Sequence, residues 1–135
     1  MGETKRVIIE SPYAGEDELE ILRNEMYGEF CMRDSLINHN EAPYASHLLY
    51  TRSNVLSDTK QEERELGIRA GFCWREVAEL TVFYQDLGMS VGMKYGLADC
   101  EDREMEFVIR LLPKNLKNQF EGKLSEAKAE FAERS

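Results

Sequence analysis

Short apolar runs alternate with longer helical patterns along this chain. Four runs rich in β-branched and aromatic residues predict buried strands. Between and after these runs, apolar residues recur at steps of three and four, which predicts amphipathic helices. The expected strands cover residues 6–10, 42–47, 80–84 and 105–110, and the expected helices cover about 16–37, 60–77, 90–100 and 114–134.

This alternation predicts an α/β fold in which helices cover both faces of a parallel sheet. Right-handed crossovers then give a flavodoxin-like, Rossmann-like doubly wound sheet of about four strands, in the order 2-1-3-4. The C-terminal amphipathic helix, at 114–134, follows the fourth strand. A chain of 135 residues is long enough for one domain with a core and too short for two, so we expect a single domain over residues 1–135.

Polar residues mark the expected helix starts. Ser90 can cap the third helix, because its hydroxyl can accept a backbone N–H bond from the first turn. Asp58 or Thr59 can cap the second helix in the same way. The segment 48–58 before it is too long for a tight turn and contains turn signals, so we expect a surface excursion.

In a sheet of this order, a ligand lies beyond the carboxyl ends of the strands, near the switch point between the first and third. Glycines there allow close backbone approach, and a helix N-terminus offers N–H groups to an anion or a sugar oxygen. The bland alternative for Asp86-Leu87-Gly88 is an ordinary turn. The expected ligand contacts are Ser11, Tyr13, His47, Asp86, Gly88, Ser90, Gly92, Met93 and Lys94.

Charge and cysteine content exclude several classes of partner. The net charge of -9 opposes binding to nucleic-acid backbones and to anionic membranes, and no apolar run reaches membrane-spanning length. Cys31, Cys73 and Cys100 show no metal-binding spacing and no disulfide framework, so we expect reduced thiols in a cytoplasmic protein. We expect no metal and no cofactor.

Several motifs are shared with a known group of enzymes. Ser11-Pro12-Tyr13 follows the first strand, and Asp86-Leu87-Gly88 precedes a Gly-Met-Lys-Tyr-Gly-Leu-Ala segment at 92–98. Asp86-Leu87-Gly88, taken together with the segment at 92–98, is similar to the Asp-x-Gly…Gly-Met-Glu-x-Gly-x-Ala segment of the nucleoside 2-deoxyribosyltransferase superfamily. The closest resemblance is to a small branch of this superfamily carried by phage and bacterial genomes, and it covers most of residues 6–98.

The resemblance implies a nucleoside or nucleotide ligand, with Tyr13 and Asp86 as contacts. Enzymes of that superfamily cleave an N-glycosidic bond through a carboxylate nucleophile, the Glu of Gly-Met-Glu. Lys94 stands at the matching position here, and other registers place Gly92 or Gly96 there. Catalysis therefore either passes through Glu10 or Asp86, or has been lost, leaving a pocket that only binds.

Three functions remain open from the sequence. The first is a nucleoside- or nucleotide-binding protein without transferase chemistry, which could sequester a nucleotide signal. The second is a divergent N-glycosidase or deoxyribosyltransferase, and the third is a structural or regulatory oligomer with a vestigial pocket.

Lys94 either faces water or contacts an anionic group of the ligand. A stripe formed by Gly67, Gly71 and Trp74 either packs on the sheet or joins two copies, and we expect a homo-oligomer.

Overall fold

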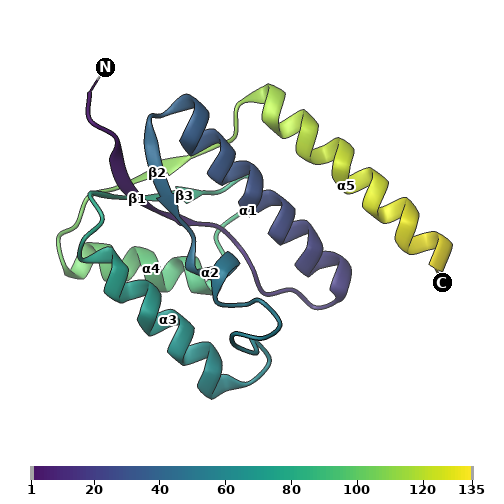
Figure 1. The fold of residues 1–135 in the computed structure, drawn as a ribbon, viewed down its shortest axis with the longest axis horizontal. Coiled ribbons are helices and arrows are strands. Elements are labelled where there is room, and N and C mark those ends of the chain that lie inside the picture. Colours follow the sequence, from purple (N-terminus) through teal and green to yellow (C-terminus); the bar gives the residue numbers. More distant parts are fainter. Residues whose placement is uncertain (1, 135) are drawn as a thin grey trace.

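The computed structural model describes residues 2–134 and contains one sheet between two layers of helices (Figure 1). Strands and helices alternate along the chain, apart from one additional short helix after the second strand. The elements are β1 (Lys5–Glu10), α1 (Glu18–Asn38), β2 (Glu41–Tyr44), α2 (Ser46–Leu49), α3 (Gln61–Arg75), β3 (Leu80–Tyr84), α4 (Val91–Asp102), β4 (Phe107–Arg110) and α5 (Lys114–Arg134).

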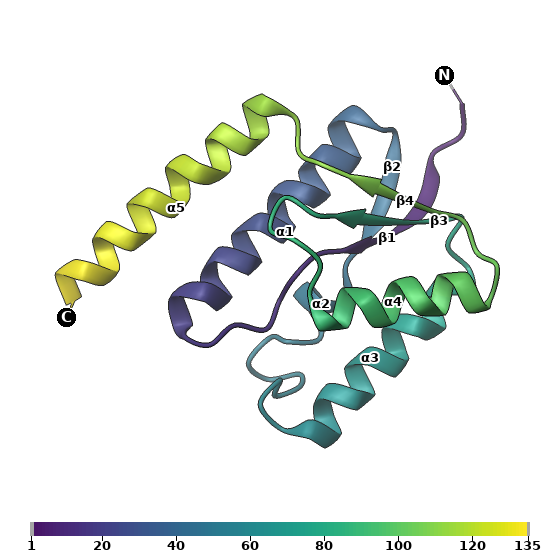
Figure 2. The ribbon, with the colours of Figure 1, turned by 180° about the vertical axis from the view of Figure 1, so that it is seen from behind.

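The four strands are all parallel and lie in the order β2-β1-β3-β4, which confirms the predicted topology. Helices α1 and α5 cover one face of the sheet, and α3 and α4 cover the other (Figures 1 and 2). In the register of the two central strands, Glu10 pairs with Phe83. The ends of β1 and β3 therefore lie side by side, which brings the loops that follow them to the same edge.

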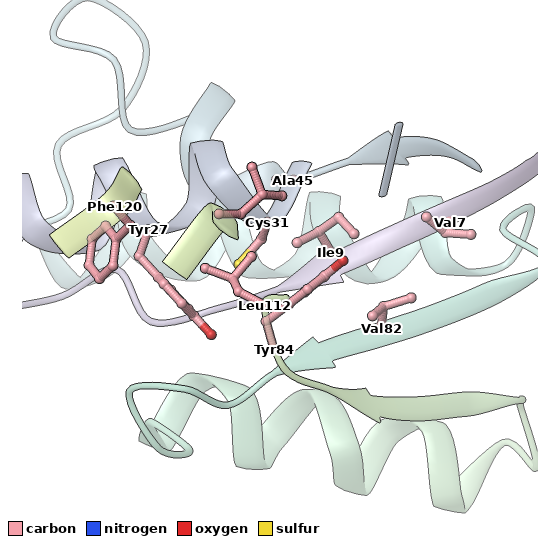
Figure 3. Packing of buried hydrophobic residues seen from close by; sticks show 10 residues of the cluster. Val7, Ile9, Tyr27, Cys31, Ala45, Val82, Tyr84, Leu112 and Phe120 are labelled. Atoms are coloured by element: carbon pink, nitrogen blue, oxygen red, sulfur yellow. The ribbon is translucent and has the colours of Figure 1, made fainter. Parts of the chain in front are cut away.

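The larger core lies between the sheet and the α1–α5 layer (Figure 3). Tyr27 of α1 and Phe120 of α5 pack ring against ring, with centroids 5.5 Å apart. On the other face a smaller cluster joins Phe83 to α4 through Met93 and Cys100. The residues of the larger core are Val7, Ile9, Tyr27, Cys31, Ala45, Val82, Tyr84, Leu112, Leu116 and Phe120.

A buried polar network crosses the α1 side of the sheet and links the two edge strands. Arg110 at the end of β4 donates to both carboxylate oxygens of Glu41 in β2, at 2.9 and 3.0 Å. The Tyr84 hydroxyl donates to Asp34 of α1 at 2.6 Å and accepts from Arg110 at 3.1 Å. Because each charged group has a partner, hydrogen bonds and ion pairs offset the cost of removing these groups from water.

One predicted boundary and one predicted cap are wrong. The second strand ends at Tyr44 rather than at His47, because Glu41–Tyr44 is the segment that pairs with β1 and the chain then turns into α2. The second long helix begins at Gln61, beside its predicted start, but neither Asp58 nor Thr59 caps it. No side chain caps this helix, and the Thr59 hydroxyl is hydrogen-bonded to Ser57 instead.

The cap predicted at Ser90 is confirmed. Its hydroxyl accepts a hydrogen bond from the backbone N–H of Met93 at 3.2 Å, and α4 begins at the next residue. The first turn of α4 is thereby fixed at the end of the loop that follows β3. This positions the N-terminus of α4 at the carboxyl edge of the sheet.

Candidate functional site

A cavity of about 330 Å³ lies at the carboxyl end of β1. Its walls come from the loop after β1, from α2 and the loop that follows it, from one side of α3, and from the first residues of α4. The sequence predicts a ligand at this edge of the sheet. The volume lies in the range of pockets that hold small molecules.

The cavity brings together most of the predicted ligand contacts. Three of the nine do not line it, namely Asp86, Gly88 and Lys94. Glu10, which the sequence suggests as an alternative catalytic group, does line it. The predicted contacts found on its walls are Ser11, Tyr13, His47, Ser90, Gly92 and Met93.

Asp86 contacts neighbouring parts of the fold. Its carboxylate Oδ2 accepts from the Tyr27 hydroxyl at 2.5 Å and from the backbone N–H of Leu112 at 3.0 Å. Its own backbone N–H donates to the Tyr27 hydroxyl at 2.9 Å. These bonds tie the end of β3 to α1 and to the segment that leads into α5. After Asp86 the chain makes a turn, which is closed by a hydrogen bond from the backbone N–H of Gly88 to the Gln85 carbonyl. Gly88 has a φ of +87° in this turn, a conformation that favours glycine.

Lys94 is exposed on α4, outside the walls of the cavity. Its backbone N–H donates to the Ser90 carbonyl as part of the helix start, at 3.0 Å. This placement agrees with the alternative in which its ammonium faces water.

The floor of the cavity holds a cluster of charged side chains from three elements. Arg75, at the end of α3, is only 2% exposed. Its Nη1 donates to Asp99 of α4 at 2.7 Å, and its Nη2 lies 3.6 Å from Oε1 of Glu10. Burial raises the pKa of Glu10 to about 7, although the Arg75 guanidinium acts in the opposite direction. Glu10 can therefore exchange a proton near neutral pH.

Ser11 and His47 form a second polar pair on the wall. The Ser11 hydroxyl and Nε2 of His47 lie 2.7 Å apart, which is a hydrogen bond. Burial lowers the pKa of His47 to about 4, so its imidazole is neutral at physiological pH. A neutral ring beside a hydroxyl can orient a polar ligand group without adding charge to the cavity.

Sequence reasoning did not identify Arg75 as a site residue. Its position four residues after Gly71, on the buried side of α3, is the signal that could have found it, because a charged residue on that side needs a partner. Glu63 and Arg64 of α3 also line the cavity. Glu63 accepts from the backbone N–H of Ser57 at 3.1 Å and so holds the loop before α3.

The two glycines of α3 face this chain's own α2 and its following loop. A Cβ added to Gly71 would lie 2.7 Å from the Ser46 hydroxyl oxygen, and one added to Gly67 would lie 3.4 Å from Leu56. These glycines therefore allow α2 and its loop to pack closely on α3. Trp74 is half exposed and donates to the Tyr50 hydroxyl at 3.1 Å. The homo-oligomer stays a prediction.

Gly96 of α4 makes room for the carboxyl group of Glu10. A Cβ added to Gly96 would lie 2.4 Å from Glu10 Oε2 and 3.2 Å from Arg75 Nη2. Gly96→Ala should therefore displace the carboxyl group and lower the free energy of unfolding by up to about 2 kcal/mol, because the cost of overpacking outweighs the gain in helix propensity from alanine. Urea unfolding would measure the loss.

Gly92→Ala is the matched control for Gly96→Ala, because it lies one turn earlier on the same helix. Its added Cβ would meet only the Ser90 hydroxyl, at 4.0 Å. This substitution should leave stability unchanged or raise it by up to about 1 kcal/mol, since alanine favours helix over glycine. Equal losses in the two variants would contradict the contact between Gly96 and Glu10.

The described part of the chain has neither a metal-type cluster nor a membrane-spanning helix. Within residues 2–134, no group of three or more His, Cys, Asp or Glu side chains is placed to hold a metal ion. No helix of this part is both long enough and apolar enough to cross a membrane.

Comparison with known proteins gives a family and no described relative. Curated proteins include no match to this chain, and solved structures include none either. A family model described as "Domain of unknown function (DUF7768)" matches residues 5–110, which include all four strands and every predicted site residue. The chain therefore belongs to the DUF7768 family.

Proposed function

We propose that this protein binds a nucleoside or nucleotide in the cavity at the carboxyl end of β1, without the transferase chemistry of the superfamily it resembles. The observation that carries the proposal is the cavity itself, which combines aromatic and polar walls. Tyr13, Phe72 and Tyr95 line it and offer surfaces against which a base could pack. Ser11 and Glu10 offer hydrogen-bonding groups for a sugar or a base.

The start of α4 supports a phosphorylated ligand as well as a nucleoside. Ser90, Val91 and Gly92 line the cavity at the N-terminus of this helix, where backbone N–H groups and the helix dipole favour an anion. Arg64 of α3 lies on the wall of the same cavity. Binding without turnover would suit sequestration of a nucleotide signal.

Loss of the superfamily nucleophile supports binding over transfer. By the resemblance, Lys94 matches the position of the nucleophilic glutamate, and the alternative registers place a glycine there. Lys94 is exposed and does not line the cavity. An ammonium group at this place cannot form the covalent intermediate that a carboxylate forms. We therefore propose a ligand-binding role as the first function.

A divergent N-glycosidase is the second candidate, and Glu10 is the observation that favours it. Its carboxyl group lines the cavity, and its pKa of about 7 suits a group that exchanges protons at neutral pH. Asp86, the other carboxylate that could replace the nucleophile, does not line the cavity and is hydrogen-bonded to Tyr27 and Leu112.

The test is a panel of nucleosides, nucleotides and dinucleotides, read by thermal shift and by chromatography of released base. We expect at least one ligand to raise the melting temperature without base release. Base release would favour the N-glycosidase, and the absence of any bound ligand would refute both proposals.

A matched pair of arginine variants tests whether a phosphorylated ligand binds in this cavity. Arg64 and Arg69 are both exposed residues of α3, but only Arg64 lines the cavity. Arg64→Gln should weaken a phosphorylated ligand by about tenfold, the usual size of a charge-assisted contact. Arg69→Gln changes the net charge equally and should leave the affinity near that of the wild type. Equal effects would show that binding depends on overall charge rather than on this cavity.

A further inference from the structure

We infer that Arg75 and Glu10 form a subsite for the lactam edge of a nucleobase, with the base carbonyl on Arg75 and the adjacent ring N–H on Glu10. The inference rests on the proposed function, because it assigns a ligand class to the same cavity. It names oxo-bases, such as hypoxanthine, guanine, uracil and thymine, in preference to adenine and cytosine.

Arg75 has two donors without a hydrogen-bond partner on one edge of its guanidinium. Nη1 is bonded to Asp99 at 2.7 Å, but Nε is buried and has no hydrogen-bond partner among the described residues. Nη2 lies 3.6 Å from Glu10 Oε1, which is beyond hydrogen-bonding distance. A buried N–H group without a partner is unfavourable, and such groups are uncommon in folded proteins. Arg75 lines the cavity, but Nε itself has almost no accessible surface, so a ligand oxygen reaches this edge through a small shift of the Arg75 side chain.

The charge around Arg75 favours an uncharged oxygen. Asp99 is shared between Arg75 and Arg103, and Glu10 and Glu76 each add a further carboxyl group beside one of these two arginines. A phosphate here would add negative charge to a cluster that has no positive charge to spare. A carbonyl oxygen has two lone pairs and can accept from both Nε and Nη2, whereas a ring nitrogen has one lone pair in the plane of the base.

Glu10 supplies the neighbouring acceptor. Its carboxyl group lies against Gly96, and the ionisable groups around it are Arg75 from α3 and Asp99 and Cys100 from α4. A carboxyl oxygen can accept a ring N–H in either protonation state. A base that presents N–H beside C=O therefore matches the donors of Arg75 and the acceptor of Glu10 together.

Inosine and adenosine are the probes that test this subsite, because they have the same sugar and nearly the same shape. They differ at position 6, where inosine carries a carbonyl next to N1–H and adenosine carries an amino group next to an unprotonated nitrogen. Isothermal titration at pH 7.5 should show inosine binding at least about tenfold more tightly than adenosine. Thymidine should likewise bind more tightly than deoxycytidine.

Arg75→Lys should remove this preference, because lysine keeps the positive charge beside Asp99 but lacks the two-donor edge. Arg103→Lys is the matched control, since Arg103 also bonds Asp99, at 3.0 Å through Nε, and does not line the cavity. The control should retain the preference for inosine. Should Arg75→Lys fail to fold, the arginine Nε–H signals of ¹⁵N-labelled wild-type protein provide the readout. The Arg75 signal should shift with inosine and stay in place with adenosine.

The outcomes separate this inference from the proposed function. Equal binding of inosine and adenosine, or a preference for adenosine, would overturn the lactam subsite and leave nucleoside binding standing. An inosine preference that survives in Arg75→Lys would also overturn it. Failure of every nucleoside and nucleotide to bind would refute the proposed function itself, and the subsite with it.

Discussion

Asp86→Ala should lower the free energy of unfolding by about 2–4 kcal/mol, because it leaves two buried donors without their acceptor. The Tyr27 hydroxyl and the backbone N–H of Leu112 both donate to Oδ2 of this carboxylate. Tyr27 is fully buried, and Leu112 is nearly so, which limits replacement of the lost bonds by water. Urea unfolding followed by circular dichroism would measure the change.

Asp86→Asn is the matched control, because an asparagine side-chain oxygen can accept both hydrogen bonds. It should cost clearly less stability than Asp86→Ala. The resemblance to deoxyribosyltransferases predicts a different result, in which Asp86→Ala keeps its stability and loses ligand. Unchanged stability together with lost binding would support that ligand contact and contradict the structural role derived from these hydrogen bonds.

The strand order could be predicted from the sequence because the apolar runs are short and the helical patterns between them are long. Val7 to Ile9 and Val82 to Tyr84 are buried, as expected of central strands in a parallel sheet. Ser90 was predictable as a cap because its effect is local, acting on an N–H three residues later. Such local rules position the loop after β3 without knowledge of the rest of the fold.

Helix α2 could not be predicted in the same way. It contains four residues, Ser46–Leu49, which is too short to show a helical period. Pro43 and Tyr44 favour an extended chain just before it, so the sequence predicts a strand that ends at His47 and places Leu48 and Leu49 in the surface excursion that follows. His47 consequently reaches the cavity from a helix rather than from a strand end.

The direction of side chains explains why the residues that line the cavity differ from those that the sequence predicts. Asp86 follows a strand at the predicted edge, but its carboxylate bonds to Tyr27, which is 59 residues away in the chain. Arg75 lies on a helix away from every predicted motif, yet it reaches the floor of the cavity. Spacing identifies the edge of the sheet where these loops meet, and tertiary packing decides which of their side chains face the cavity.

The cluster on the floor of the cavity should make the protein less stable as the pH rises. Glu10 has a pKa of about 7 in the folded chain, against an ordinary value of 4.5, mainly because burial penalises its charged form. The folded state therefore binds more protons than the unfolded state between these two values. The contribution of Glu10 to stability should be unchanged below about pH 4.5, fall as the pH rises to 7, and stay at its lower level above that.

Glu10→Gln isolates this contribution, because glutamine resembles the protonated carboxyl group and does not titrate. At pH 8 the variant should be more stable than the wild type by about 3 kcal/mol, and the difference should fall below about 1 kcal/mol at pH 5. Urea unfolding at pH 5, 6, 7 and 8 would measure it, with the exposed Glu106→Gln as a control that should show no such trend. A difference between Glu10→Gln and wild type that is constant with pH would contradict burial of a titrating carboxyl group. A difference that grows with pH would mean that the folded chain retains Glu10 at a cost in stability, as expected of a residue kept for its contact with a ligand.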